Sequence, residues 1–574
     1  MIFRQILISS VFLAVSVNAQ AKGTIYLKDY LNRDSISSVD AMPALRAALE
    51  DCAKQGASEL VLPGGTLNLK PDYAFEQYEY ISNNDPSMKR IAFCLREVKN
   101  FTIKGNGTRL LFSGFISAFS LANCSNIRIE ELSIDYVRPF VSESAITNAG
   151  DGWLEVKFPD SYLVNLQEGQ LQFRDENGVT YPYSSLLEFD PKLKEVAYHV
   201  HDYWIWGESL PAVKTADGSW RFYRKDFGEA HIGNNMVFGA TARLNPAFTL
   251  LECENFYLGN VTIYHCGGMG VIAQSSRNIE LNRVNVVPSP GSGRTISISA
   301  DATHFVNCKG YIKMIDCDFR NQKDDATNIH GWYMAVDQII GNNKLILRWK
   351  NSGQYGVEFI RKGMPLELVN NKTMESYARL IVDKVRYLNS QYAEVTFAKP
   401  LPKSIEPNHI VAEDDEYPDV LISGCYIGNN RARGLLIGSR GHVVIEKCTF
   451  HTPGAAILFE GDGSYWFEQS GVRNVIIRDN LFENCMYGST TWGSACIAVG
   501  SGIPDKAHSR YHKNITVENN IFRGFDNRIV NIYCVDGFVF KNNTIEMTDD
   551  YPAYGDPGKR FIANDCENVV FELK

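Results

Sequence analysis

The 574-residue sequence contains three aspartates whose type and spacing suit acid–base chemistry. The tripeptide Asp-Ala-Thr begins at Asp301 and again, 24 residues later, at Asp325, which Asp324 directly precedes. If the chain coils with a period near that length, the two copies occupy equivalent corners of successive coils. All three carboxyl groups would then lie within a few ångströms, where mutual repulsion disfavours full ionisation and raises at least one pKa.

Carboxyl groups in different protonation states can hydrolyse a glycosidic bond, one as the acid and another through a bound water. In this pattern Asp301 and Asp325 can jointly hold and deprotonate the water. Asp324, beside two negative neighbours, is expected to keep a proton and to serve as the general acid. Such an arrangement suits inversion of configuration. Clustered aspartates are also typical of Ca²⁺ sites and of polar surface turns, so the pattern alone leaves both alternatives open.

Further candidates for substrate binding flank this cluster. Aligning the next coil by its strand places Arg433 over Asp325, either as a sugar ligand or as a simple salt bridge. His304 and His330 follow the aspartates and are expected to face the same side, as sugar-binding or structural groups outside the acid–base assignment. A Gly-rich loop one coil further on supplies three more candidates: Glu460, Asp462 and Trp466. An indole there can stack on a sugar face or simply cover the array.

The positions of cysteine and asparagine indicate how these residues are held. Cys425 and Cys448 are 23 residues apart, and intervals of 32, 40 and 23 residues lead on to Asn480, Asn520 and Asn543. A period near 23 with loop insertions and short Val/Ile/Phe-rich strands predicts an all-β protein, a right-handed parallel β-helix with three short strands in each coil. Because asparagine replaces cysteine at one structural position, the cysteines are interpreted as buried free thiols in a stacked ladder.

Two stretches interrupt the repeat with alternating strand patterns. Residues 137–248 and 333–416 are predicted to form inserted antiparallel, barrel-like β modules that wall the functional face. An amphipathic helix over 40–55 is predicted to cap the open end of the coils. The insertions divide the β-helix into three predicted segments: 22–136 with the capping helix, 249–332 with the aspartates, and 417–574.

The first residues and the composition bear on location and partners. Residues 1–21 combine an early Arg4, an apolar run and a Val-Asn-Ala site, which predicts a cleaved signal peptide and export to the periplasm or beyond; a membrane anchor is the alternative. No other segment has the pattern of a membrane span. The net charge of −9 disfavours nucleic acid and favours neutral partners. No zinc, P-loop or dinucleotide motif stands out, so no cofactor or metal is predicted.

The segments SADATHFVNCKGYIKMIDCDFRNQKDDATNIHG (299–331) and RARGLLIGSRGHVVIEKC (431–448) resemble glycoside hydrolase family 110, the exo-acting α-1,3-galactosidases. The resemblance covers most of the chain beyond the signal peptide. It implies a parallel β-helix with inserted β-barrel modules, and an inverting reaction without metal. The implied substrates carry terminal α-1,3-linked galactose, as in the blood-group B determinant. Asp301, Asp324 and Asp325 match the family's aspartate cluster position by position.

A more distant similarity, to the polygalacturonases of glycoside hydrolase family 28, implies the individual roles. It makes Asp324 the acid and has Asp301 and Asp325 hold the water. The chain lacks that family's Arg-x-Lys uronate-binding motif, which fits a neutral galactoside. Three alternatives remain: a Ca²⁺-dependent polysaccharide lyase, a polygalacturonase-like hydrolase of another glycan, and a non-catalytic glycan-binding β-helix. The oligomeric state is open, with a homodimer through a module as one possibility.

Overall fold

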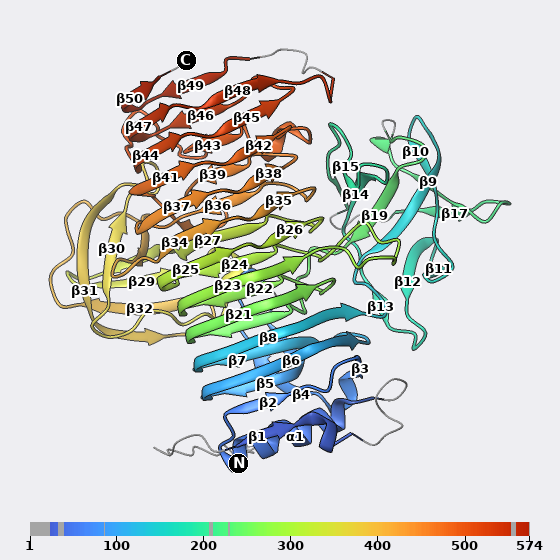
Figure 1. Cartoon of the computed structure of the whole chain (residues 1–574). Coiled ribbons are helices and arrows are strands. Elements are labelled where there is room, and N and C mark those ends of the chain that lie inside the picture. The colour runs from blue at the N-terminus through green and yellow to red at the C-terminus, as the bar shows by residue number, and fades with distance from the viewer. Residues whose placement is uncertain are drawn as a thin grey trace.

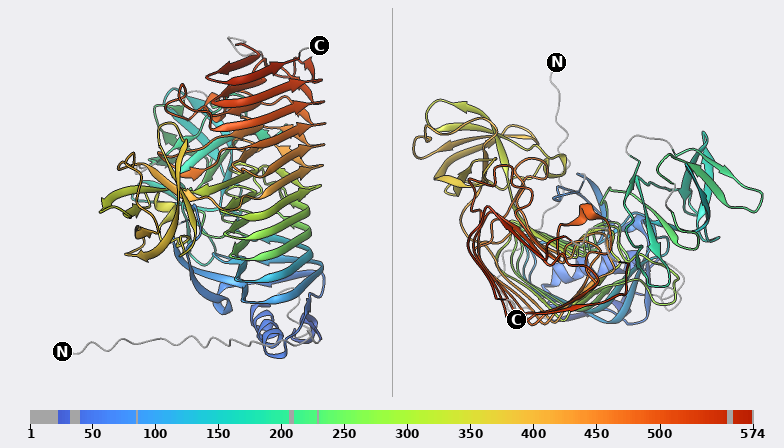
Figure 2. Two further views of the ribbon diagram at one scale, coloured as in Figure 1. Left: turned by 90° about the vertical axis from the view of Figure 1, so that its left-hand side faces the viewer. Right: turned by 90° about the horizontal axis from the view of Figure 1, so that it is seen from above.

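A computed structural model of the chain describes residues 23–31, 40–84, 86–205, 210–227, 230–552 and 558–572. The chain forms an upright stack of parallel coils from which two modules project (Figure 1). Seen down the coil axis, the modules flank one face of the stack (Figure 2). The predicted fold class, a parallel β-helix with two inserted barrel-like modules and a capping helix, is confirmed. The predicted signal peptide, 1–21, lies outside the described residues.

Within the described residues, each coil contributes one strand to a 13-stranded sheet. To a 20-stranded sheet the later coils contribute two short strands each, whereas some earlier coils contribute one long strand such as β21 (Glu254–Ile263). One such coil consists of β36 (Leu435–Ile437), β37 (His442–Glu446) and β38 (Thr449–His451). Each strand pairs in parallel with its counterpart in the next coil: β39 (Ile457–Phe459), β41 (Asn474–Arg478) and β42 (Leu481–Glu483). Inward side chains thereby stack on their equivalents, and the ring centroids of Phe450 and Phe482 lie 4.9 Å apart.

The 13-stranded sheet faces the space between the modules and carries the aspartates near its middle. Its central strands follow one another in parallel: β22 (Val271–Gln274), β24 (Thr303–Val306), β27 (Thr327–Trp332), β36, β39 and β43 (Ile497–Val499). Alternate residues of each strand enter the core, as Phe305 and Ile329 do. The residues between them therefore point out of the coil on this face.

A ladder of asparagines runs through the bend between the second and third strands of the C-terminal coils. The side-chain N–H of Asn480 donates to the side-chain oxygen of Asn520 at 2.9 Å, and Asn520 donates to Asn543 at 2.9 Å. The backbone N–H of Cys448 donates to Asn480 at 2.9 Å, which joins the cysteine part of the row to the asparagine part. All 13 cysteines lie in the described residues and are free, which confirms the interpretation as thiols. Three of them are only partly buried: Cys94, Cys496 and Cys566.

The predicted capping helix is α1 (Met42–Gln55). The carboxylate of Asp40 accepts the Met42 N–H at 2.9 Å just before the helix, and Gly56, with φ of 63°, ends it in a left-handed conformation. Its apolar face is buried against the first coil, as the fully buried Leu45 illustrates. No helix among the described residues is long and apolar enough to cross a membrane.

The first module is an antiparallel assembly of two sheets. The larger one contains β9 (Ser142–Gly150), β10 (Trp153–Lys157), β14 (Ser185–Asp190), β15 (Glu195–Val196), β16 (Tyr203–Trp204), β17 (Ala212–Lys214), β18 (Trp220–Tyr223) and β19 (Asn235–Gly239). The smaller one contains β11 (Leu163–Gln167), β12 (Gln170–Arg174) and β13 (Thr180–Tyr181). Glu195 reaches the β-helix, where its carboxylate lies 2.7 Å from Nε2 of His451.

The second module is a closed antiparallel barrel. Its strands are β28 (Met334–Ile340), β29 (Lys344–Arg348), β30 (Pro365–Val369), β31 (Ser376–Tyr387), β32 (Tyr392–Phe397) and β33 (Ile410–Glu413). An apolar core of its own, with the buried Trp349 and Phe359, fills it. Arg440 of the β-helix donates to both carboxylate oxygens of the buried Glu367, at 2.8 and 2.9 Å, and so fastens the barrel to the coils.

We expect Asn520→Ala to lower the free energy of unfolding by about 1–3 kcal/mol, because two buried N–H groups of Asn480 lose the oxygen that accepts them. Thr516→Ala is the matched control, since Thr516 lies between the inward residues Ile515 and Val517 of β44 (His512–Glu518) in the same coil. Urea denaturation measures both. Equal losses would show that the ladder adds nothing beyond ordinary packing.

Candidate active site

A cavity of about 880 Å³ lies over β24, β27, β36 and β39. Both inserted modules line it, the first through Trp204 and Arg243 and the second through Asn351 and Gly353. Asn83, from the N-terminal part of the chain, completes one end. All nine residues singled out in the sequence contribute to this lining: Asp301, His304, Asp324, Asp325, His330, Arg433, Glu460, Asp462 and Trp466.

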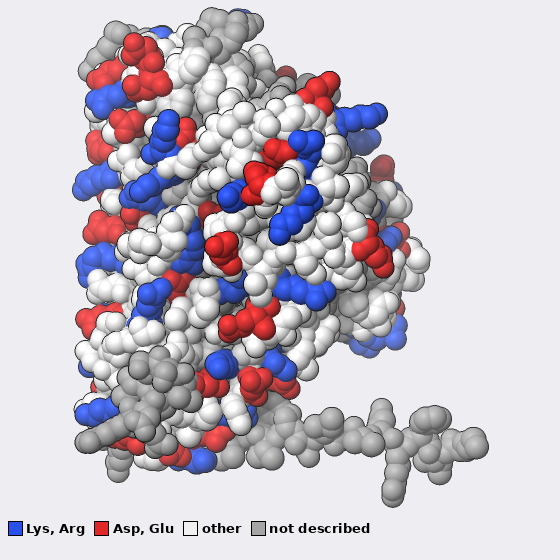
Figure 3. Space-filling model, turned by 90° about the vertical axis from the view of Figure 1, so that its right-hand side faces the viewer, with Lys and Arg blue, Asp and Glu red and all other residues white. Residues whose placement is uncertain are grey.

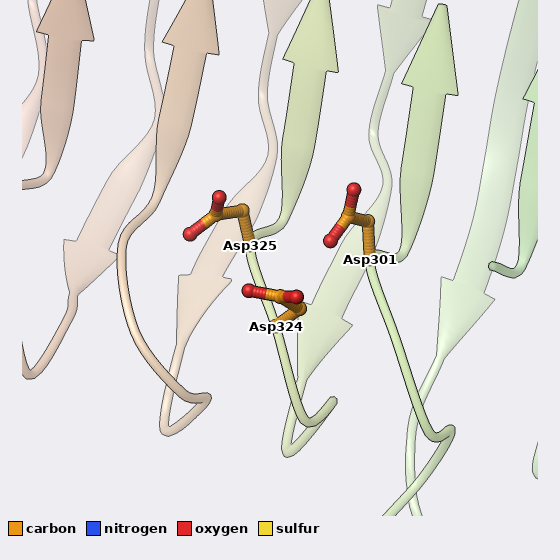
Figure 4. A group of neighbouring side chains, drawn as sticks. All are labelled: Asp301, Asp324 and Asp325. Atoms are coloured by element: carbon orange, nitrogen blue, oxygen red, sulfur yellow. The ribbon is translucent and has the colours of Figure 1, made fainter. Parts of the chain in front are cut away.

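The three aspartates meet as the repeat predicts. Asp301 and Asp325 each lie two residues before a strand, and the strands that follow are in register, with Thr303 beside Thr327. Both carboxyl groups point to the same side, with Asp324 just ahead of Asp325 (Figure 4). One oxygen from each of the three lies within 4.8 Å of the other two. The side chain of Asp324 is 15% exposed, whereas those of Asp301 and Asp325 are each 4% exposed.

Two guanidinium groups bind Asp324. Arg243, at the end of the first module, donates to one carboxylate oxygen, and Arg431 donates to the other at 3.0 Å. Burial raises the pKa of this carboxyl group, but Arg431 and Arg243 outweigh burial and lower it. The sequence-based expectation that Asp324 keeps a proton because its neighbours are negative is therefore wrong for the sugar-free protein. Its nearest partners are cations.

The pKa of Asp325 shifts in the opposite direction. Arg433 donates three hydrogen bonds to it, from the backbone N–H at 3.1 Å, from Nε at 3.0 Å and from Nη2 at 2.9 Å. Burial nevertheless raises the pKa of Asp325 to about 7, with the charges of Asp324 and Asp301 adding to the rise and Arg433 opposing it. The predicted contact of Arg433 with Asp325 is present. Since the groups titrate together, the cluster retains one shared proton into the neutral range.

The two histidines form a chain of hydrogen bonds that ends on Asp301. Nδ1 of His304 lies 2.6 Å from the Asp301 carboxylate, and its Nε2 lies 2.9 Å from Nε2 of His330. Nδ1 of His330 lies 2.8 Å from the carbonyl oxygen of Gly331, and burial lowers the pKa of this imidazole. A neutral His330 that donates to Gly331 accepts from His304. His304 thus lies between His330 and Asp301, and the two imidazoles orient the Asp301 carboxylate.

The Gly-rich loop contributes in three different ways. Asp462 accepts the backbone N–H groups of Ser464, Tyr465 and Trp466 at 2.6–2.9 Å, so its carboxylate shapes the loop. Trp466 is 47% exposed at the rim, edge-on to Tyr465. Glu460 accepts from Ser501 and Gly502 with one carboxylate oxygen, and burial raises its pKa.

Known proteins share this organisation. Family models match the chain at residues 142–234 (GLAA-B beta-barrel domain I), 344–411 (GLAA-B beta-barrel domain II) and 408–503 (right handed beta helix region). Alpha-1,3-galactosidase A of Shewanella woodyi is 33% identical over 525 residues, which cover 90% of this chain and 85% of that protein. The chain belongs to the α-1,3-galactosidase family. This confirms the resemblance on which the sequence-based hypothesis rests.

Further relatives of this family cover the chain still more fully. Alpha-1,3-galactosidase A of Bacteroides fragilis is 31% identical, over 97% of this chain and 93% of that protein. Alpha-1,3-galactosidase B of Bacteroides thetaiotaomicron is 28% identical, over 98% and 92%. Among solved structures, the endo-xylogalacturonan hydrolase of Aspergillus tubingensis has a TM-score of 0.43 at 10% identity, over 94% of this chain and 99% of that one.

Several residues of this α-1,3-galactosidase family site escaped the sequence-based reasoning. Arg431 stands in the same Arg-Ala-Arg tripeptide as Arg433. Because alternate residues of an extended segment point to the same side, the sequence could have indicated that Arg431 faces the aspartates as Arg433 does. Arg243 is 81 residues from its partner and had no such signal. Lys323, next to Asp324, lies in the cavity wall, and burial lowers its pKa to about 8.

We expect Arg431→Leu to cost about 3 kcal/mol of folding free energy, because it leaves Asp202 and Asp324 as buried carboxylates without their shared cation. Asp202→Asn in the same chain should recover part of the loss by removing one of the two charges. Guanidinium denaturation of both variants tests this. A loss below about 1 kcal/mol in the single variant would contradict a structural role for the pair.

Proposed function

We propose that the protein is an exo-acting α-1,3-galactosidase that hydrolyses terminal α-1,3-linked galactose by a single displacement with inversion. The observation that carries the proposal is the stacked cluster of Asp301, Asp324 and Asp325 in a cavity walled by both modules. Relatives that align over most of the chain are named alpha-1,3-galactosidases. Linear and fucosylated (blood-group B type) galactosides are the substrates expected.

Position supports the division of roles within the cluster. Asp301 and Asp325 stand at equivalent corners of neighbouring coils, where a water between them can be held by both and lose a proton to one. Asp324 is the most exposed of the three and lies beside them rather than in their row. A carboxyl group there can approach the glycosidic oxygen from another side, as inversion requires.

Asp324 has to gain a proton before it can act as the acid. In the sugar-free site Arg431 and Arg243 lower the pKa of Asp324, whereas burial raises that of Asp325 to about 7, so of these two groups Asp325 keeps a proton to the higher pH. A sugar hydroxyl that takes the place of Asp324 on either guanidinium would raise the pKa of Asp324 and draw the proton to it. The base pair Asp301 and Asp325 would then be free to accept a proton from water.

The charges of the cavity favour a neutral glycan over an acidic one. Each arginine that lines it already binds a carboxylate: Arg243 and Arg431 bind Asp324, and Arg433 binds Asp325. A uronate would have to displace one of these pairs or bind at Lys323, whose pKa is lowered by burial, which weighs against the polysaccharide lyase and the polygalacturonase-like alternatives. Acidic and basic side chains are also interspersed on the face in Figure 3, unlike a surface for nucleic acid. Export and a homodimer remain predictions.

Proton NMR of the wild-type protein acting on a Galα1,3Gal disaccharide, with a chelator present, tests the proposal. Early release of β-galactose is the expected result. Early α-galactose would refute inversion, and an unsaturated product would identify a lyase. If the protein binds the disaccharide but does not hydrolyse it, the result would favour a non-catalytic glycan-binding protein. Three clustered carboxylates could hold Ca²⁺, and the chelator removes this ion, so the experiment also tests whether the reaction depends on it.

We expect Asp301→Asn, Asp324→Asn and Asp325→Asn each to lower kcat by about 10³-fold or more, because each removes a proton-transfer or water-holding group. Asp479→Asn is the control, since Asp479 is exposed on the same array and has a φ of 57° that asparagine tolerates. Galactose release from the disaccharide gives the rates. A cluster variant with wild-type kcat would remove that residue from the mechanism.

The pH dependence of kcat/KM tests whether Asp324 is the general acid. If Asp324 must be protonated, kcat/KM falls as the pH rises through its pKa, and a cation beside it moves that fall to lower pH. Arg243→Gln should therefore shift the alkaline limb of kcat/KM upward by about one pH unit. Lys225→Gln, a change on the exposed surface of the same module, should leave the limb in place. A downward shift in Arg243→Gln would contradict an acid role for Asp324.

A further inference from the structure

The arginine that binds Asp324 from the β-helix is also bound by the first module. Nε of Arg431 donates to both carboxylate oxygens of Asp202, at 2.8 and 3.0 Å, and its Nη1 donates to Asp324 at 3.0 Å. The side chains of Asp202 and Arg431 are 7% and 16% exposed, so both charges are largely removed from water. One guanidinium group is therefore shared by two carboxylates, of which only Asp324 belongs to the aspartate cluster.

The first module also helps to fix the orientation of this guanidinium group. Asp202 directly precedes β16, and the ring of Trp204 in that strand lies 5.5 Å from the central carbon of the Arg431 guanidinium. The ring of Trp492, from a later coil, lies 5.7 Å from the same carbon, and both distances are typical of cation–π contacts. A guanidinium group is planar and carries its N–H groups in a rigid fork. With Nε turned to Asp202, the fork presents Nη1 to Asp324.

The charge of Asp202 opposes the effect of Arg431 on Asp324. Burial lowers the pKa of Arg431, but Asp202, and after it Asp324, outweigh burial and raise it. Because charges in a buried site are weakly screened, the negative charge of Asp202 offsets part of the positive charge that stabilises an ionised Asp324. Lys323 is a second cation that faces Asp202. Other charged or titratable groups also face Asp324 itself: Asp301, His304, Asp325, Arg243 and Arg433.

We propose that Asp202 is a positioning residue for the general acid: it binds Arg431 from the side of the first module and so keeps this arginine from turning fully onto Asp324. Without Asp202, Arg431 could bind Asp324 through two N–H groups, and its whole charge would hold the carboxyl group ionised. A sugar hydroxyl would then draw the cations from Asp324 less easily, and fewer molecules would carry the proton that the leaving sugar needs. This inference rests on the proposed function. It adds that the first module sets the acidity of the site as well as walling it.

The pH dependence of Asp202→Asn tests the inference. Asparagine has nearly the same shape and keeps an oxygen for Nε of Arg431, but it lacks the charge. The alkaline limb of kcat/KM for Galα1,3Gal should therefore move to lower pH by about one unit, opposite to the shift expected for Arg243→Gln. Asp202→Ala should move it the same way, and urea denaturation shows whether each variant is folded. Asp151→Asn, in the exposed turn between β9 and β10 of the same module, is the control and should leave the limb in place.

A second background and a second substrate show how Asp202 acts. In an Arg431→Gln protein, adding Asp202→Asn should move the alkaline limb by less than about 0.3 unit, because the residue through which Asp202 acts is gone. Fluoride leaves α-galactosyl fluoride with little need of a proton, unlike a sugar. Above the wild-type limb, Asp202→Asn should lower kcat/KM about tenfold for the disaccharide and less than about threefold for the fluoride. If Arg431→Gln folds poorly, this comparison of substrates still decides.

The outcomes separate this inference from the proposed function. A wild-type protein that hydrolyses neither substrate would overturn the proposed function, and the inference with it. An active wild type whose alkaline limb stays in place or moves upward in Asp202→Asn would overturn the inference alone. An equal shift in the Arg431→Gln protein would do the same, since Asp202 would then act directly or through Lys323. Equal losses on the two substrates would also overturn it, because they would indicate a general disturbance of the site.

Discussion

The parallel register of the coils is the constraint on which the rest of the structure depends. It places each side chain beside its counterpart at the spacing of neighbouring strands, about 4.8 Å. Within the core this favours like on like, and Asn480, Asn520 and Asn543 join into one continuous row of hydrogen bonds. Just before the central strands of the 13-stranded sheet, the same register sets Asp325 beside Asp301, where two like charges repel each other. One geometric rule thus produces a stabilising ladder and a chemically strained cluster.

Burial makes that repulsion costly unless cations compensate, and the fold supplies them from three places. Arg433 comes from the following coil, Arg431 from the turn just before it, and Arg243 from the end of the first module. The histidine chain adds a hydrogen bond between His304 and Asp301. Because Asp324 receives two arginines and Asp325 only one, their pKa values separate in opposite directions. Such a separation between neighbouring acids is what general acid–base catalysis uses.

The modules also decide what can reach the cluster. A bare parallel β-helix presents a long open face, on which a polymer could lie in either direction. Here Asn83 and Glu468 meet over His304 and Asn328, while Gln354 and Gly353 of the second module hold Asn83 in place at 3.2 and 2.9 Å. These contacts bound one end of the cavity. Both insertions thus bound a cavity on what would otherwise be an open face, which fits the exo-acting hydrolysis proposed above.

The sequence by itself determined the β-helix architecture and the pairing of Asp301 with Asp325. Coil period, strand propensity and the helix before Gly56 are local or periodic properties, and the repeated Asp-Ala-Thr needed only that period to bring Asp301 and Asp325 together. Tertiary structure alone decided the protonation of Asp324, because Arg243 approaches it from 81 residues away. It also decided how one end of the cavity is bounded, where Asn83 meets His304 across 221 residues. The charges around Asp324 and the contact of Asn83 with His304 both depend on residues that are not related by the coil repeat. They could therefore be seen only in the folded chain.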